Sequence, residues 1–140
     1  MVCLSYAGVP PYSKIIELHP NDSYTYSGLA FCYKQLNQYE KAIQNYSAII
    51  ALYPKDSNAY NSRALCYKQL KQYENMIQDY SAIIKLCPKD SDAYLTRGSA
   101  YLEAKEHEKA IQYFKKVLEL NPRNALAKKN LKACHKALGK

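Results

Sequence analysis

Residues 57–90 read SNAYNSRALCYKQLKQYENMIQDYSAIIKLCPKD, and this 34-residue stretch has a copy on either side of it in the same register. Residues 23–56 and 91–124 carry the same kinds of residue at the same positions. Four prolines stand 34 residues apart: Pro20, Pro54, Pro88 and Pro122. A supersecondary unit that is copied at a fixed period of about 20–50 residues indicates a stacked repeat array.

Each 34-residue unit contains two predicted amphipathic helices. Counted from Ser23, Ser57 and Ser91, repeat positions 4, 8 and 11 share one helical face, and positions 20, 24, 27 and 28 share another. Small residues at positions 8 and 20 let two helices approach closely, and aromatic residues fill the space beside them. A short polar side chain before each first helix is expected to cap its free amides: Asp22, Asp56, Asp90 and Asn124.

This pattern resembles the tetratricopeptide repeat family, in which positions 4, 11 and 24 are aromatic, positions 8 and 20 are small and position 32 is proline. In the first unit the aromatic positions hold Tyr26, Tyr33 and Tyr46, and the small positions hold Ala30 and Ala42. The resemblance implies an all-α fold, a right-handed α-solenoid of antiparallel helix pairs. We expect seven or eight helices in all.

The repeat register also predicts the organisation of the chain, because the resemblance extends over residues 12–138. The parts are an unmatched leader with a partial repeat, repeats 1, 2 and 3, and a C-terminal capping helix: residues 1–22, 23–56, 57–90, 91–124 and 125–140. The partial repeat supplies only a second helix, so its apolar face lacks the first helix that would cover it. We expect either the leader or a second copy of the chain to cover this self-association surface: Tyr12, Ile15, Ile16 and Leu18.

The 140-residue chain has a formal net charge of +8, and Ala125–Lys140 contributes +5 of it. Since no basic stripe follows the repeats, these lysines indicate a solvated cap, and we expect no nucleic-acid partner. No apolar run approaches the roughly 18–20 residues that span a bilayer, so we expect no membrane association. The first eleven residues carry neither a charged leader nor a long apolar stretch, and this favours a cytoplasmic location.

Nothing in the sequence predicts an enzyme, a cofactor or a metal site. Phosphate loops, nucleophile elbows and HExxH motifs are absent from the sequence, and the three histidines occupy unrelated repeat positions. The five cysteines stand at least 21 residues apart, which excludes a CxxC pair and favours free thiols in a reducing compartment. We therefore expect no catalytic residue, no cofactor and no bound metal.

In arrays of this family the first helices line a concave groove, mainly through repeat positions 2, 5, 9 and 12. The resemblance therefore implies a peptide-binding groove of twelve residues: Tyr24, Ser27, Phe31, Lys34, Asn58, Asn61, Leu65, Lys68, Asp92, Leu95, Ser99 and Leu102. Its amide side chains can hydrogen-bond an extended peptide, while Phe31, Leu65 and Leu95 can receive apolar side chains. We expect these three to be accessible and the position-11 tyrosines to be buried between helices: Tyr33, Tyr67 and Tyr101.

The sequence disfavours one use of the family. Co-chaperone members grip the C-terminal carboxylates of heat-shock chaperones through lysine, arginine and asparagine at five groove positions. Here those positions hold other residue types: Ser27, Phe31, Ser62, Asp92 and Thr96. None of them supplies a cation and Asp92 would repel a carboxylate, so we do not expect a chaperone carboxylate clamp.

The sequence thus favours a non-enzymatic scaffold that binds a peptide segment or helix of another protein. Two alternatives stay open: a homo-oligomerisation module that forms a homodimer through its open N-terminal end, and an accessory domain of a larger assembly. A heterologous partner that is lost on Phe31→Ala would support the scaffold, whereas recovery of self-copies alone would support oligomerisation.

Overall fold

In the computed structural model, residues 11–140 are described, with side chains from Lys14 onward. These residues form eight α-helices and no strand, so the predicted all-α helical-repeat fold is confirmed. The helices belong to two compact units, of which the first ends at Lys71 and the second begins at Gln72.

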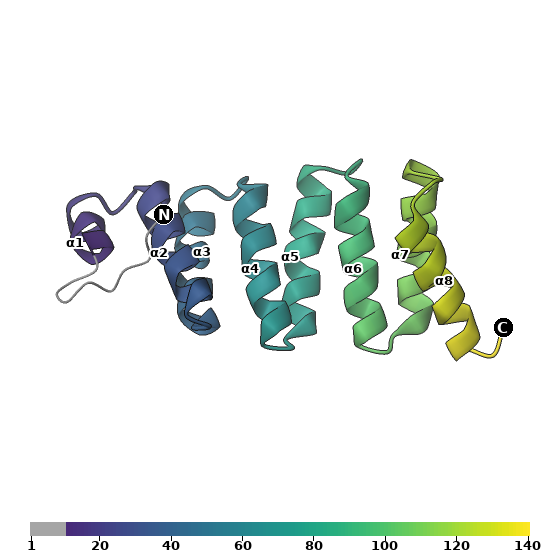
Figure 1. Ribbon diagram of the computed structural model, residues 1–140. Helices are drawn as coiled ribbons and strands as arrows, with labels where there is room; N and C mark the ends of the chain where they lie inside the picture. The colour runs from purple at the N-terminus through teal and green to yellow at the C-terminus, as the bar shows by residue number, and fades with distance from the viewer. Residues whose placement is uncertain (1–10) are drawn as a thin grey trace. The chain divides into compact units, whose positions relative to one another are not determined.

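The first unit contains α1 (Pro11–Leu18), α2 (Ser23–Gln35), α3 (Tyr39–Leu52) and α4 (Ser57–Gln69). Helices that follow each other along the chain lie side by side within it (Figure 1). Each of α2 and α4 starts at the first position of a repeat, and α3 starts at position 17. The first unit is therefore a run of paired repeat helices that begins with the single helix α1.

The second unit contains α5 (Tyr73–Leu86), α6 (Ser91–Glu103), α7 (His107–Leu120) and α8 (Ala125–Ala137). Here too, α6 packs on both α5 and α7, and α7 packs on α8. Each repeat proline lies two residues beyond the end of a second helix, which a proline cannot continue.

The predicted caps are confirmed at all four first helices: Asp22, Asp56, Asp90 and Asn124. The shortest of these bonds runs from the Ala127 amide to the Asn124 side chain, at 2.8 Å. The second helices α3, α5 and α7 have no side-chain cap bond. The cap residues therefore account for where the first helices start. The second helices lack such caps, so packing has to account for where they start.

The turn at repeat position 15 has a feature that the sequence did not predict. Asn37, Lys71 and Lys105 have positive φ angles of 58°, 57° and 61°, and Gly139 has 73° at the same position after α8. The left-handed region favours glycine, because a Cβ crowds the neighbouring carbonyl there. Lysine adopts it here because each turn must close one helix and reverse the chain into the next.

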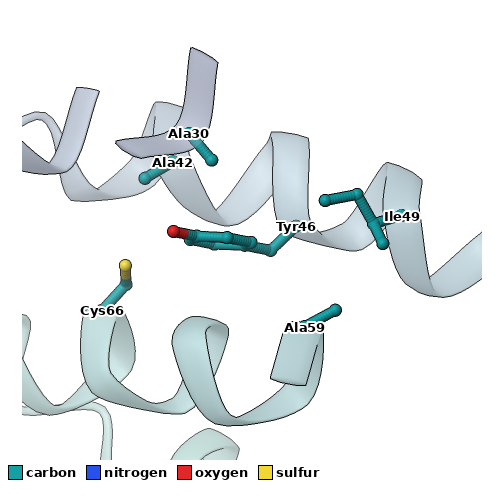
Figure 2. Packing of buried hydrophobic residues seen from close by; sticks show 6 residues of the cluster. All are labelled: Ala30, Ala42, Tyr46, Ile49, Ala59 and Cys66. Carbon is teal, nitrogen blue, oxygen red and sulfur yellow. The ribbon is translucent and has the colours of Figure 1, made fainter. Parts of the chain in front are cut away.

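A first core cluster of buried residues joins α2, α3 and α4: Ala30, Ala42, Tyr46, Ile49, Ala59 and Cys66. Figure 2 shows the Tyr46 ring between α3 and α4, with its hydroxyl on the side of Cys66 and Ala42. The small residues admit this ring because their helices can approach it closely.

A second core cluster lies in the second unit: Ala110, Ile111, Phe114, Val117, Ala127 and Cys134. Five of its six members occupy the same repeat positions as members of the first core cluster. The repeat thus builds a similar core in each unit, and the differences between these two clusters are confined to a few positions.

Candidate functional site

In the first unit, eight of the predicted groove residues lie on two helices and form what we call the α2–α4 face. They are Tyr24, Ser27, Phe31 and Lys34 on α2, and Asn58, Asn61, Leu65 and Lys68 on α4. Their spacing of three or four residues places each set of four on one face of its helix. Phe31 and Leu65 are each 38% exposed, as predicted, and Tyr24 is exposed almost completely.

A pocket of about 340 Å³ opens on this face. Tyr24, Ser27 and Asn58 of the predicted groove line the pocket, so the N-terminal ends of α2 and α4 both contribute to it. The pocket also takes in residues that the groove prediction missed: Ser23, Tyr46, Ile49, Asp56, Ala59 and Ser62. Phe31, Leu65 and the two lysines do not line the pocket and lie further along the two helices.

The pocket has a polar wall and an apolar floor. Serine hydroxyls and the Asn58 amide can donate and accept hydrogen bonds, and Tyr46 and Ile49 of α3 offer ring and aliphatic surface. Asp56 is the one charged residue in the lining, and its carboxylate already accepts the Ala59 amide at 3.1 Å as the cap of α4. The pocket therefore suits an uncharged polar or apolar segment better than a carboxylate.

Two titratable groups belong to the first core cluster, Tyr46, which lines the pocket, and Cys66, which does not line it, and burial governs the pKa of both. Burial raises the pKa of the Tyr46 phenol, the nearby Cys66 thiol raises it further, and a hydrogen bond with the Ser62 side chain lowers it. Burial also raises the pKa of the Cys66 thiol, and the charge of Lys34 partly offsets this. Both groups are therefore neutral at neutral pH, so neither is an activated nucleophile or base.

In the second unit, α6 carries the other four predicted groove residues: Asp92, Leu95, Ser99 and Leu102. Asp92 is exposed and the other three are half-buried. The expected accessibility of Leu95 is therefore wrong in degree. Leu95 and Leu102 both pack against the second core cluster, which covers part of each side chain.

The position-11 tyrosines are half-buried, so the prediction that they are buried is also wrong in degree. Their remaining ring surface faces cations: Lys41 lies 5.4 Å from the centroid of the Tyr33 ring, and Arg63 lies 5.8 Å from that of Tyr67. A ring that borders solvent can attract a cation to its electron-rich face, and this packing does not require full burial.

The self-association surface is only partly described. Leu18, at the end of α1, is 75% exposed, while Ile15 and Ile16 are half-buried. The side chain of Tyr12 and the leader of residues 1–10 lie outside the described residues, so the predicted covering of this surface stays a prediction.

Cys66, Cys87 and Cys134 are free thiols, but Cys32 is disulfide-bonded, so the expectation of free thiols is wrong for Cys32. Within the described part of the chain, no three histidine, cysteine or acidic side chains come together as metal ligands would. No helix of residues 11–140 is both long and apolar enough to cross a bilayer.

Family models described as tetratricopeptide repeat match three stretches of the chain: residues 12–44, 57–90 and 91–124. No curated protein matches the sequence. Among solved structures, the crystal structure of MamA superposes with a TM-score of 0.81 at 23% identity, over 91% of this chain and 75% of the MamA chain. At that identity the likeness concerns the fold alone.

Two further similar structures are complexes with peptides. The first TPR of Spaghetti (RPAP3), bound to the HSP90 peptide SRMEEVD, has a TM-score of 0.73 at 25% identity and covers 84% of this chain and 94% of its own. The second TPR domain of human RPAP3, in complex with the HSP70 peptide SGPTIEEVD, has a TM-score of 0.71 at 27% identity and covers 83% and 96%.

Proposed function

Because the chain belongs to the tetratricopeptide repeat family, we propose that its first unit binds an extended peptide segment of another protein on the α2–α4 face. Domains of this family generally mediate protein–protein interactions and are typically not enzymes. The finer assignment is supported chiefly by one observation, the 340 Å³ pocket with a polar wall and an apolar floor beside two exposed apolar side chains.

An extended segment fits this face better than a helix, because a helix has already paired most of its backbone groups. The pocket offers hydrogen-bond partners for the unpaired backbone of such a segment. They are the hydroxyls of Ser23, Ser27 and Ser62 and the amide of Asn58. Phe31 and Leu65 then contact apolar side chains of the same segment.

The partner differs in chemistry from the peptides in the RPAP3 complexes. Those peptides end in EEVD, and the pocket lining here holds no cation but does hold the Asp56 carboxylate. The positions that would supply clamp residues in the first unit hold Ser27, Phe31 and Ser62. We therefore propose a partner segment that is uncharged where it covers the pocket.

The test compares two double variants in affinity capture from cell extract. The groove variant is Phe31→Ala with Leu65→Ala, and the control is Leu36→Ala with Leu52→Ala, which removes apolar side chains of similar exposure from outside the α2–α4 face. Since a truncated interface anchor typically costs about 1 kcal/mol or more, we expect the groove variant to bind its partner at least about tenfold more weakly.

The control variant is expected to capture the same heterologous protein as the unaltered chain. Recovery of self-copies alone would support oligomerisation instead, and equal loss in both variants would contradict the assignment to this face. Circular dichroism of each variant checks that the helical content is unchanged.

A further inference from the structure

A second pocket, of about 660 Å³, lies in the second unit between the ends of α7 and α8. Its floor is apolar and consists of Leu118 on α7 and Leu131 on α8. Its rim carries four exposed lysines: Lys128, Lys132, Lys136 and Lys140. We call it the α8 lysine pocket.

The surface of α8 that forms this pocket corresponds to the surface by which α6 holds α7. On α6, Tyr94 and Tyr101 stack against Tyr113 of α7, with ring centroids 6.5 and 5.3 Å apart. Gly98 lies between them, and a Cβ there would come within 2.9 Å of the Phe114 ring. Repeat positions 4, 8 and 11 of α6 thus provide a close helix–helix contact.

On α8 the same three repeat positions hold Lys128, Lys132 and His135. Lys132 replaces the residue that has no room for even a methyl group in α6. A helix packed as closely as α7 on α6 would therefore overlap the Lys132 side chain and bury its charge without a partner. An occupant must stand further out and bring negative charge.

The lysines are arranged in a regular row, because they are spaced four residues apart. Side chains four apart on a helix share one face, with a rise of about 6 Å between them. Lys140 lies beyond the end of α8 but also lines the pocket, and its amide donates to the His135 carbonyl at 2.8 Å across the left-handed turn at Gly139. None of the residues that line the pocket is acidic.

We propose that the α8 lysine pocket docks an acidic amphipathic helix of another protein. Carboxylates at four-residue intervals on that helix face the lysine row, and a leucine-sized side chain rests on Leu118 and Leu131. The apolar floor favours a peptide over a nucleic acid, whose backbone has no comparable apolar group to place there. The α8 lysine pocket shares no residue with the α2–α4 face, and it would bind an acidic partner where that face would bind an uncharged segment.

A synthetic helical peptide tests the proposal directly. The probe carries glutamates at four-residue intervals and one leucine row, with a fluorescein label, and its binding to the full chain is followed by fluorescence polarisation at low salt. We expect Lys132→Glu to weaken binding at least about fivefold and Lys129→Glu less than about twofold, because Lys129 lies on the same helix, is also exposed and does not line the pocket.

Three results would overturn the proposal. In the first, a fluorescein-labelled single-stranded DNA binds more tightly than the peptide, and Lys132→Glu and Lys129→Glu weaken its binding equally. The lysine row would then be a nonspecific basic surface. A concentration-dependent dimer that Lys132→Glu abolishes would make the occupant a second copy. If a probe with serine in place of leucine binds as well as the original, the apolar floor does not contribute to binding.

Discussion

The two core clusters share five of their six repeat positions but differ in the ring at position 24. In the first, Tyr46 keeps 5% of its surface exposed, lines the pocket of the α2–α4 face and hydrogen-bonds Ser62. In the second, Phe114 is fully buried and packs so tightly on Gly98 that no Cβ fits between them. The first core therefore borders a polar pocket through Tyr46, whereas Phe114 is closed off from solvent in the second.

This difference follows a rule that links neighbouring repeats. Tyr46 hydrogen-bonds Ser62, and Tyr80 hydrogen-bonds Thr96 in the same way, so in repeats 1 and 2 the position-24 tyrosine pairs with a hydroxyl at position 6 of the following repeat. At the third repeat the ring is Phe114 and the position-6 residue is Asn130. A buried phenol needs a hydrogen-bond partner, whereas a phenylalanine needs only close packing.

Truncation of the two rings is expected to give the largest difference. Phe114→Ala should lower the free energy of unfolding by about 3–5 kcal/mol, because it leaves a closed apolar cavity. Tyr46→Ala should cost less, because the space that it leaves adjoins the pocket and can take up water. Urea unfolding followed by circular dichroism measures both losses of stability. A loss in Tyr46→Ala that equals or exceeds the loss in Phe114→Ala would contradict the distinction between a core that borders a pocket and a core that is closed.

Alkaline pH is expected to affect the tyrosine pairs and spare the phenylalanine. Burial raises the pKa of Tyr80 to about 12, against a partial lowering by the Thr96 hydrogen bond and a further rise from Asp79. Between pH 10 and 12 the unfolded chain loses a proton that the folded chain keeps, so stability falls as the pH rises, by on the order of 2 kcal/mol.

The control for this pH dependence is Tyr80→Phe, which should flatten the fall in stability over that window. The raised pKa values of Tyr46 and Tyr113 leave some of the slope in place. A slope that is unchanged in Tyr80→Phe would mean that Tyr80 ionises normally in the folded protein.

The smallest of these effects concerns the close approach at position 8. Gly98→Ala should destabilise the protein by about 1–2 kcal/mol, because the new methyl group meets the Phe114 ring at 2.9 Å, and this outweighs the better helix propensity of alanine. Ala30→Gly in the first core cluster should also destabilise, by about 1–2 kcal/mol, through lower helix propensity and the loss of a buried methyl group. A stabilising Gly98→Ala would show that the second core is looser than described.

The sequence could predict the helices and their first turns, because the repeat period and the capping residues are local signals. It could not predict the left-handed turns at Lys71 and Lys105, since lysine does not favour them and the pairing of helices imposes them. The partial burial of Leu95 depends on what the second core cluster presents to it, which no local pattern contains.

Three of the nine residues that line the pocket could be predicted. Positions 2 and 5 identified Tyr24, Ser27 and Asn58, because the family resemblance points to them. Ser62 was missed as a lining residue, although the recurrence of a tyrosine at position 24 with a hydroxyl at position 6 of the next repeat could have indicated it. A signal of this kind spans two repeats, so it is not seen when each repeat is read alone.

Site-specific photo-crosslinking tests the peptide-binding role of the α2–α4 face most directly. A benzophenone side chain is placed at Ser27, which is exposed and lines the pocket, and in a second protein at Gln44, which is exposed on α3 outside it. We expect the captured partner to crosslink at position 27 and not at position 44, with a single peptide segment attached. Crosslinking at position 44 alone, or equally at both positions, would contradict the assignment of peptide binding to the α2–α4 face.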